Sequence, residues 1–260
     1  MFWIWAGLWL NASAYGSPWA PQWKTSIQLD APPLALHITQ MNDRNVLLVH
    51  EPDGIRFRQP QTGDVVAEIQ THVESLSLWA TEPRPTFALC GADGLQVLQT
   101  GPEHIVTLTQ IQPEPCRNIV TTQIGKTRLV AFEREGFLQS YRIDEAGTWT
   151  QETSDKIPEG SNSLIAEGAY AIAMGWTGAS HLTEISARGT MTIPTGGPVE
   201  TLAAGPGGWI WGIQGGTALV PLIGVPVTVA RPIQNLYSVH LDDDNQADII
   251  LKHQEGPPSV

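Results

Sequence analysis

The chain has 260 residues, of which 42% are hydrophobic and only 15% are charged, and its formal net charge is -12. The 14 basic residues are scattered, which argues against nucleic acid as a partner, because phosphate binding needs clustered lysine and arginine. With 25 glycines, 20 prolines and no convincing amphipathic helical pattern, the composition favours an all-β fold with many turns.

The N-terminus opens with an apolar run, Phe2 to Leu10, followed by Ala12-Ser13-Ala14, which fits the small-x-small pattern of a cleavage site. The run is too short to span a bilayer, which takes about 20 apolar residues. We therefore expect residues 1–14 to be a signal peptide and residues 15–260 to form a secreted or periplasmic domain with no integral membrane segment. The alternative is an apolar segment that lies on the fold, since no lysine or arginine precedes the run.

A glycine-containing turn recurs at spacings of 38 to 42 residues. The glycines concerned are Gly54, Gly94, Gly136, Gly178, Gly216 and Gly256. A short apolar run precedes each of them, at residues 46–50, 87–90, 128–132, 170–175, 209–213 and 248–253. Further strand-like runs complete most of the units, at residues 65–69, 104–111, 148–152, 190–193 and 225–230. Glycine is expected here because tight hairpins require a positive φ. Four short strands every ~40 residues match one blade of a β-propeller.

The two ends of the chain carry complementary parts of one unit. Residues 23–29 precede the first inner strand, residues 34–40, just as residues 225–230 precede the strand at residues 236–241. We therefore predict six four-stranded blades, closed into a ring by a blade shared between the N- and C-termini, which leaves no free sheet edge. The alternative is an open array cut from a longer chain.

The two cysteines, Cys90 and Cys116, fall in consecutive units. Two interpretations remain open: a disulfide, which an exported protein permits, and a pair of buried free thiols. Neither cysteine belongs to a CxxC pair, which disfavours zinc binding and redox catalysis.

Signatures of catalysis are missing from the sequence. It has no GxSxG and no HExxH motif. Residues 144–149, DEAGTW, resemble the Asp-box turn of sialidases and related propellers, although Arg142 stands where serine belongs and Ala146 where glycine belongs. In those families the box is a folding device, so the resemblance implies no activity.

The last unit contains an acidic turn in residues 236–252, LYSVHLDDDNQADIILK. Asp242, Asp244 and Asp248 alternate around it, and Gln246 can add its backbone carbonyl. Calcium takes about six to eight oxygen ligands, so these four residues predict a structural Ca²⁺ site. The alternative is a solvated acidic turn, in which aspartate and asparagine bond to their own backbone.

This stretch resembles the calcium loop of FG-GAP/VCBS repeats, the propeller units also found in integrin α-subunit heads. In that family an acidic loop of the form D-x-D-G-D-G-x-x-D joins the first two strands of a blade, and Asp242, Asp244 and Asp248 match its second, third and last acids. His240 replaces the first acid, and Asp243 and Asn245 replace the glycines. The resemblance implies a degenerate repeat with one recognisable calcium loop.

Many FG-GAP/VCBS proteins sit on or outside the cell and mediate adhesion or assembly. Together with the missing catalytic motifs, this predicts an exported, non-catalytic binding or scaffold module for a protein or cell-surface partner. The alternative is an extracellular propeller enzyme that acts on glycans or lactones, a sialidase-like or other hydrolase.

Overall fold

The computed structural model describes residues 2–8, 23–29, 35–41, 44–51, 53–80, 86–100, 106–168, 170–204, 210–214, 218–221, 227–239 and 248–254. Every helix or strand within these ranges is a β-strand, and the strand pairs are antiparallel. The chain falls into two units, Met1–Ile119 and Val120–Val260, and each is described by itself.

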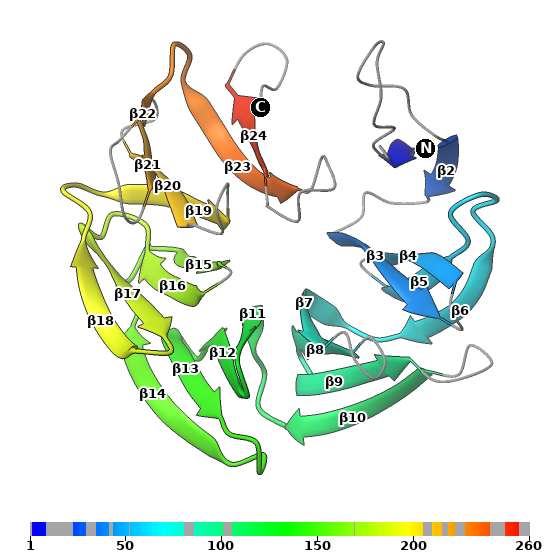
Figure 1. The fold of residues 1–260 in the computed structure, drawn as a ribbon, viewed down its shortest axis with the longest axis horizontal. Coiled ribbons are helices and arrows are strands. Elements are labelled where there is room, and N and C mark those ends of the chain that lie inside the picture. Colours follow the sequence, from blue (N-terminus) through cyan, green and yellow to red (C-terminus); the bar gives the residue numbers. More distant parts are fainter. Residues whose placement is uncertain are drawn as a thin grey trace. The chain divides into compact units, whose positions relative to one another are not determined.

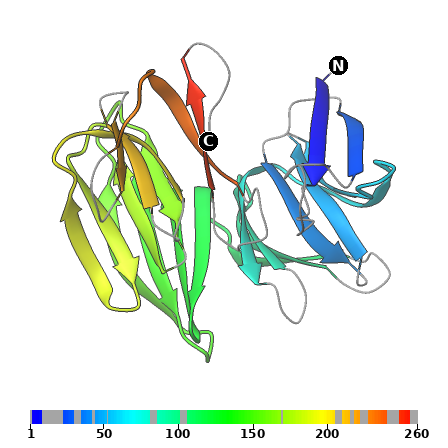
Figure 2. The same ribbon diagram turned by 45° about the horizontal axis from the view of Figure 1, so that its top comes forward.

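Unit 1 contains two four-stranded sheets and one strand pair (Figure 1). The first sheet consists of β3 (Ala35–Met41), β4 (Arg44–Glu51), β5 (Gly54–Arg58) and β6 (Val65–Gln70), in that order. The second consists of β7 (Val73–Ala80), β8 (Thr86–Gly91), β9 (Gly94–Thr100) and β10 (Val106–Gln112). The pair is β1 (Phe2–Leu8) with β2 (Trp23–Leu29), drawn in dark blue in Figure 2. β1 lies in the predicted signal peptide, whose cleavage stays a prediction.

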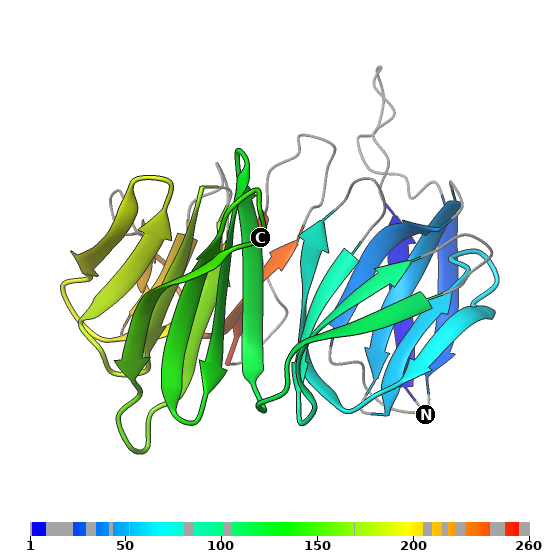
Figure 3. The same cartoon turned by 90° about the horizontal axis from the view of Figure 1, so that it is seen from below.

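Unit 2 contains three four-stranded sheets and a second pair, and β11 begins in the last residues of unit 1. The first sheet is β11 (Arg117–Ile124), β12 (Thr127–Arg134), β13 (Phe137–Ile143) and β14 (Trp149–Lys156), the green strands of Figure 3. The second is β15 (Ser163–Glu167), β16 (Ala171–Trp176), β17 (His181–Ser186) and β18 (Gly189–Pro194). The third is β19 (Val199–Ala204), β20 (Ile210–Gln214), β21 (Ala218–Pro221) and β22 (Val227–Thr228). The pair is β23 (Ile233–Val239) with β24 (Asp248–His253).

The repeat predicted from the sequence is confirmed as a series of four-stranded sheets. The six predicted apolar runs coincide with β4, β8, β12, β16, β20 and β24. Each of these is the second strand of its sheet or strand pair in chain order. In the four-stranded sheets the second strand has a neighbour on either side, and the central residues of β4, β8, β12 and β16 are buried, so these strands contain continuous apolar runs. The described residues form five complete four-stranded sheets; a sixth, shared blade stays a prediction.

Glycine is needed in the hairpins for two different reasons. Glu135 and Gly136 both have a positive φ, 52° and 76°, as a two-residue turn between paired strands requires. Gly54 has no positive φ, and the expectation of one at that position is corrected. A Cβ on Gly54 would lie 2.3 Å from the carbonyl oxygen of Ile69, so glycine is required there by close packing of β5 against β6. Two further predicted turn glycines, Gly216 and Gly256, lie outside the described residues.

The apolar cores lie between successive sheets within each unit. In unit 1 the core joins the two four-stranded sheets and consists of Val46, Leu48, Ile55, Phe57, Val73, Phe87, Leu89 and Leu98. In unit 2 one core joins the first two sheets and consists of Leu129, Ala131, Leu138, Ile157, Ile172, Met174 and Ile185. Burial of a leucine- or phenylalanine-sized side chain contributes about 1.5–3 kcal/mol, so this packing is the main stabilising term.

A disulfide joins Cys90 in β8 to Cys116, with 5.1 Å between their Cα atoms. The sequence left open a disulfide or a pair of buried free thiols, and the structure shows the disulfide. The amide of Cys116 also donates to the carbonyl oxygen of Gly91, and the amide of Ile119 donates to the Ser75 hydroxyl at 3.0 Å. The segment that leads into β11 is therefore fixed to the β7–β10 sheet both covalently and by hydrogen bonds.

His50 is a buried titratable group at the end of the apolar run of β4. Its side chain is only 1% exposed, and Nε2 lies 2.8 Å from the carbonyl oxygen of Val73, the first residue of β7. Nε2 therefore donates its proton to that oxygen and links the two sheets of unit 1. Burial lowers the pKa of His50 below its ordinary value of 6.5, because the fold disfavours the charged imidazolium.

The pKa of His50 predicts a loss of stability in mild acid. A lowered pKa means that the unfolded chain binds the proton more readily, so the stabilisation is complete above about pH 6.5 and is lost as the pH falls below it. In urea unfolding at about pH 7.5 and about pH 5.5, the wild type should lose more free energy of unfolding than His50→Gln, whose amide still donates to Val73 but does not titrate. Equal losses in the two proteins would contradict the assignment.

Candidate interaction surface

The predicted calcium loop connects two observed strands. β23 and β24 pair with Val239 opposite Asp248, so the acidic turn joins the first two strands of its unit, as the resemblance implied. Asp242, Asp244 and Gln246 lie outside the described residues, and Asp248 is placed only as the first residue of β24. The calcium site therefore stays a prediction. In the described ranges no group of three or more histidine, cysteine or acidic side chains is arranged to hold a metal.

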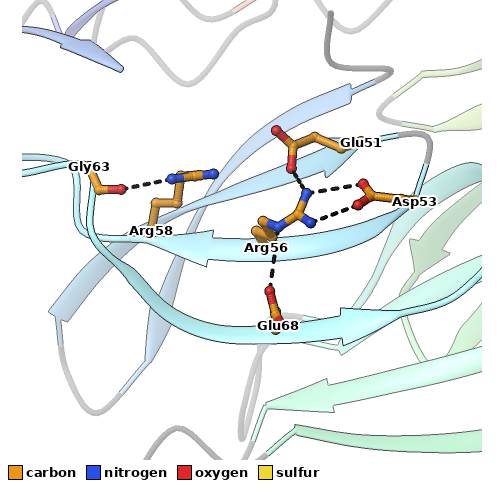
Figure 4. A network of polar contacts seen from close by, with 6 residues as sticks. All are labelled: Glu51, Asp53, Arg56, Arg58, Gly63 and Glu68. Atoms are coloured by element: carbon orange, nitrogen blue, oxygen red, sulfur yellow. Dashed lines mark hydrogen bonds and ion pairs between the residues drawn. The ribbon is translucent and has the colours of Figure 1, made fainter. Parts of the chain in front are cut away.

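One arginine gathers three carboxylates at the β4–β5 hairpin of unit 1 (Figure 4). Arg56 donates both Nη atoms to the Asp53 carboxylate, at 3.0 and 2.8 Å, and Nη1 also contacts Glu51. Its Nε lies 3.4 Å from Glu68 on β6. The next arginine on the strand, Arg58, donates instead to the carbonyl oxygen of Gly63 at 3.0 Å.

Burial differs across this cluster, and that difference decides its role. The Glu51 side chain is 3% exposed and Arg56 is 23% exposed, whereas Asp53 is 67% and Glu68 50% exposed. Hydrogen bonds to Asp53 and then Glu51 raise the pKa of Arg56, and the bond from Arg56 lowers the pKa of Asp53. A permanently charged arginine that neutralises a buried carboxylate holds the hairpin together, which is a structural role.

The Asp-box-like turn lies between β13 and β14. Asp144 accepts a hydrogen bond at Oδ1 from the amide of Thr148 at 2.9 Å, and its carbonyl accepts one from Gly147 at 3.0 Å. Gly147 has a φ of 81°, which the turn requires. The aspartate binds the backbone of its own turn, which is a structural role.

A second polar cluster joins the first two sheets of unit 2. Arg142 on β13 donates from Nε to Glu152 on β14 at 2.8 Å, and from Nη2 to the carbonyl oxygen of Ser186 on β17 at 3.0 Å. Thr190 on β18 donates its hydroxyl to the other oxygen of Glu152 at 3.1 Å. Arg142 was noted in the sequence only as a departure from the Asp box, and no local pattern revealed its contacts across 44 residues.

Among the described residues, four of the six large apolar side chains that remain exposed lie on the last strand of a sheet, and the other two are Leu78 on β7 and Tyr170 before β16. Val65 on β6, Ile111 on β10, Met191 on β18 and Val227 on β22 are between 39% and 54% exposed. Each of these strands ends its sheet and has a single partner strand among the described residues. The outer strands therefore present both apolar side chains and a free backbone edge.

Comparison by sequence finds no relatives: no known family's sequence model matches the chain, and no curated protein matches it. Within the described ranges no helix is long and apolar enough to cross a membrane.

Comparison by structure identifies the fold. The chain is similar to BBS1N in its complex with ARL6DN, with a TM-score of 0.64 and 12% identity over 91% of this chain and 80% of that one. It is also similar to the Dos1 propeller (TM-score 0.57, 10% identity, 86% of this chain and 66% of that one). A third similar structure is virginiamycin B lyase from Staphylococcus aureus (TM-score 0.53, 15% identity, 83% and 76%). These likenesses, together with the four-stranded antiparallel sheets, show that the chain has a β-propeller fold.

Removal of the arginine in the hairpin cluster should be strongly destabilising. Arg56→Met leaves the buried Glu51 carboxylate without its counter-ion and should lower the free energy of unfolding by about 3 kcal/mol in urea titrations. The matched control is Lys126→Met, which breaks a pair with Glu145 whose side chains are 79% and 61% exposed and should cost less than about 1 kcal/mol. Equal effects of the two substitutions would show that burial of Glu51 does not matter.

Proposed function

We propose that the chain is an exported, non-catalytic β-propeller that serves as a binding or scaffold module for a protein or cell-surface partner. In this proposal it is a degenerate FG-GAP/VCBS-type propeller with six blades, the last built from both termini. In the mature chain of this proposal, which begins at Tyr15, β2 at one end and the β23–β24 pair at the other supply strands for such a blade.

The disulfide supports a location outside the cytoplasm. Disulfides form and persist in oxidising compartments such as the periplasm and the extracellular space, whereas cytosolic thiols are kept reduced. Cys90 and Cys116 are 0% and 5% exposed, so the bridge is part of the core. The apolar N-terminal run and Ala12-Ser13-Ala14 are the export signal in this proposal.

The observation that carries the binding role is the likeness to BBS1N, whose structure was determined in complex with another protein, ARL6DN. A propeller can bind partners with its sheets as a rigid frame, without any reacting group. The exposed apolar side chains on the outer strands are a second support, because partners bury such side chains. The net charge of -12 favours a partner with a basic surface.

Calcium is part of the proposal as a structural ion held by Asp242, Asp244, Gln246 and Asp248 at the turn between β23 and β24. If it is bound, a chelator should lower the melting temperature of the wild type, and Asp244→Ala should remove that sensitivity because it deletes a ligand. Asp243→Ala is the matched control, since Asp243 replaces a glycine of the family's loop and should leave the sensitivity unchanged. A melting temperature that does not respond to chelator would rule out the ion.

The binding role is tested with the purified mature chain immobilised against an extract of the native cell envelope. We expect a protein that is retained saturably and released by salt, because an acidic surface binds through screened charges. The same preparation is assayed against a panel of glycans and lactones. Turnover of one of these substrates, with no protein retained, would replace the scaffold proposal with the enzyme alternative.

A further inference from the structure

β18 is an outer strand whose edge carries no charged side chain. Its six residues are Gly189, Thr190, Met191, Thr192, Ile193 and Pro194. β17 is its one partner strand in the described part of the chain, so its other edge presents backbone N–H and C=O groups without strand partners. Folded proteins normally protect such edges with charges, because a free edge recruits another strand.

Two of the other outer strands carry charged side chains. β6 carries Glu68, which is paired with Arg56, and β14 carries Glu152, Asp155 and Lys156. β10 and the two-residue β22 are uncharged as well, with Ile111 at 39% and Val227 at 48% exposed. Among the described outer strands, β18 combines an uncharged edge with the most exposed of these apolar side chains, Met191 at 54%.

The two faces of β18 differ. On one face, Thr190 contacts Glu152 of β14 and belongs to the polar cluster of unit 2. On the other face, Met191 lies directly opposite Glu184 of β17, and directly opposed residues have Cβ atoms about 4.5–5.5 Å apart. Glu184 is half-buried, and its side-chain carboxylate makes no hydrogen bond or ion pair with any described residue. An exposed thioether therefore stands beside an uncompensated carboxylate.

We propose that the free edge of β18 binds an extended segment of another protein, with a lysine or arginine of that segment opposite Met191. The segment adds a strand to the β15–β18 sheet, its aliphatic stem packs on Met191, and its charged head reaches towards Glu184. This inference rests on the proposed binding function and names both its site and the chemistry of its partner.

Charge indicates that the segment bound to β18 comes from another protein and not from a second copy of this chain. Two copies that each carry a net charge of -12 repel one another, and β18 itself holds no basic side chain to meet Glu184. Arg188 lies in the turn before the strand, and its guanidinium forms no ion pair with Glu184. A cationic segment satisfies both the free edge and the carboxylate.

The test uses labelled ten-residue peptides in which threonine and valine alternate with lysine, and a matched set with glutamate in place of lysine. Binding is followed by fluorescence anisotropy and located by amide hydrogen exchange. The lysine peptides should bind and slow exchange in β18.

Met191→Lys should weaken peptide binding at least about tenfold, because it places a charge on the edge, while Glu184→Gln should weaken it about threefold. Val65→Lys, at the 44% exposed position on β6, is the matched control and should have no effect.

Other results overturn the inference. They are equal binding of lysine and glutamate peptides, insensitivity to Met191→Lys, slowed exchange elsewhere than β18, or dimerisation of the chain that Met191→Lys abolishes. Melting curves show that each variant is folded before binding is measured. A captured envelope partner that binds Met191→Lys as well as wild type would remove this inference and leave the proposed binding function standing.

Discussion

Burial of the second strand of a four-stranded sheet, described for β4, β8, β12 and β16, is the constraint on which the rest of the structure depends. A strand such as β8, which is buried along its whole length, must have hydrogen-bonded neighbours on both edges and side chains packed against both faces. A lone four-stranded sheet covers the edges of such a strand but leaves its faces to solvent. Sheets of this kind must therefore pack on one another, which is what the cores in both units show. This packing of four-stranded sheets on one another is the physical reason for the structural similarity to known propellers.

Hydrogen bonds, an ion pair and a disulfide then join segments that are distant in the sequence. His50 donates to Val73 between the two sheets of unit 1, the disulfide holds the segment before β11, and Arg142 joins two sheets of unit 2 through Glu152 and Ser186. Each is buried or half-buried, where an unmade hydrogen bond or an unpaired charge would be costly. The outer strands β14 and β18 take part in these contacts through Glu152 and Thr190. The outer strands also keep exposed apolar side chains and free edges, and on β18 these become the proposed binding site.

Much of the fold could be predicted because a doubly buried strand leaves a continuous apolar run in the sequence. The predicted run at residues 87–90 lies within β8, and that at residues 46–50 lies within β4. The reason for Gly54 could not be predicted, since it depends on the closeness of Ile69 across the sheet. The partners of Arg56 and His50 were missed because side chains reach across strands, and alternation along one strand does not report them. The sequence also left the pairing of Cys90 with Cys116 open, because spacing alone does not reveal that Cα atoms lie 5.1 Å apart.

A disulfide-linked propeller that works outside the cytoplasm is the centre of the functional proposal. The most direct test is mass spectrometry of the protein isolated from its native cells and digested without reduction. The proposal predicts a linked pair of peptides that contain Cys90 and Cys116, and a mature N-terminus at Tyr15. Free thiols at both cysteines in a protein that still begins at Met1 would contradict it.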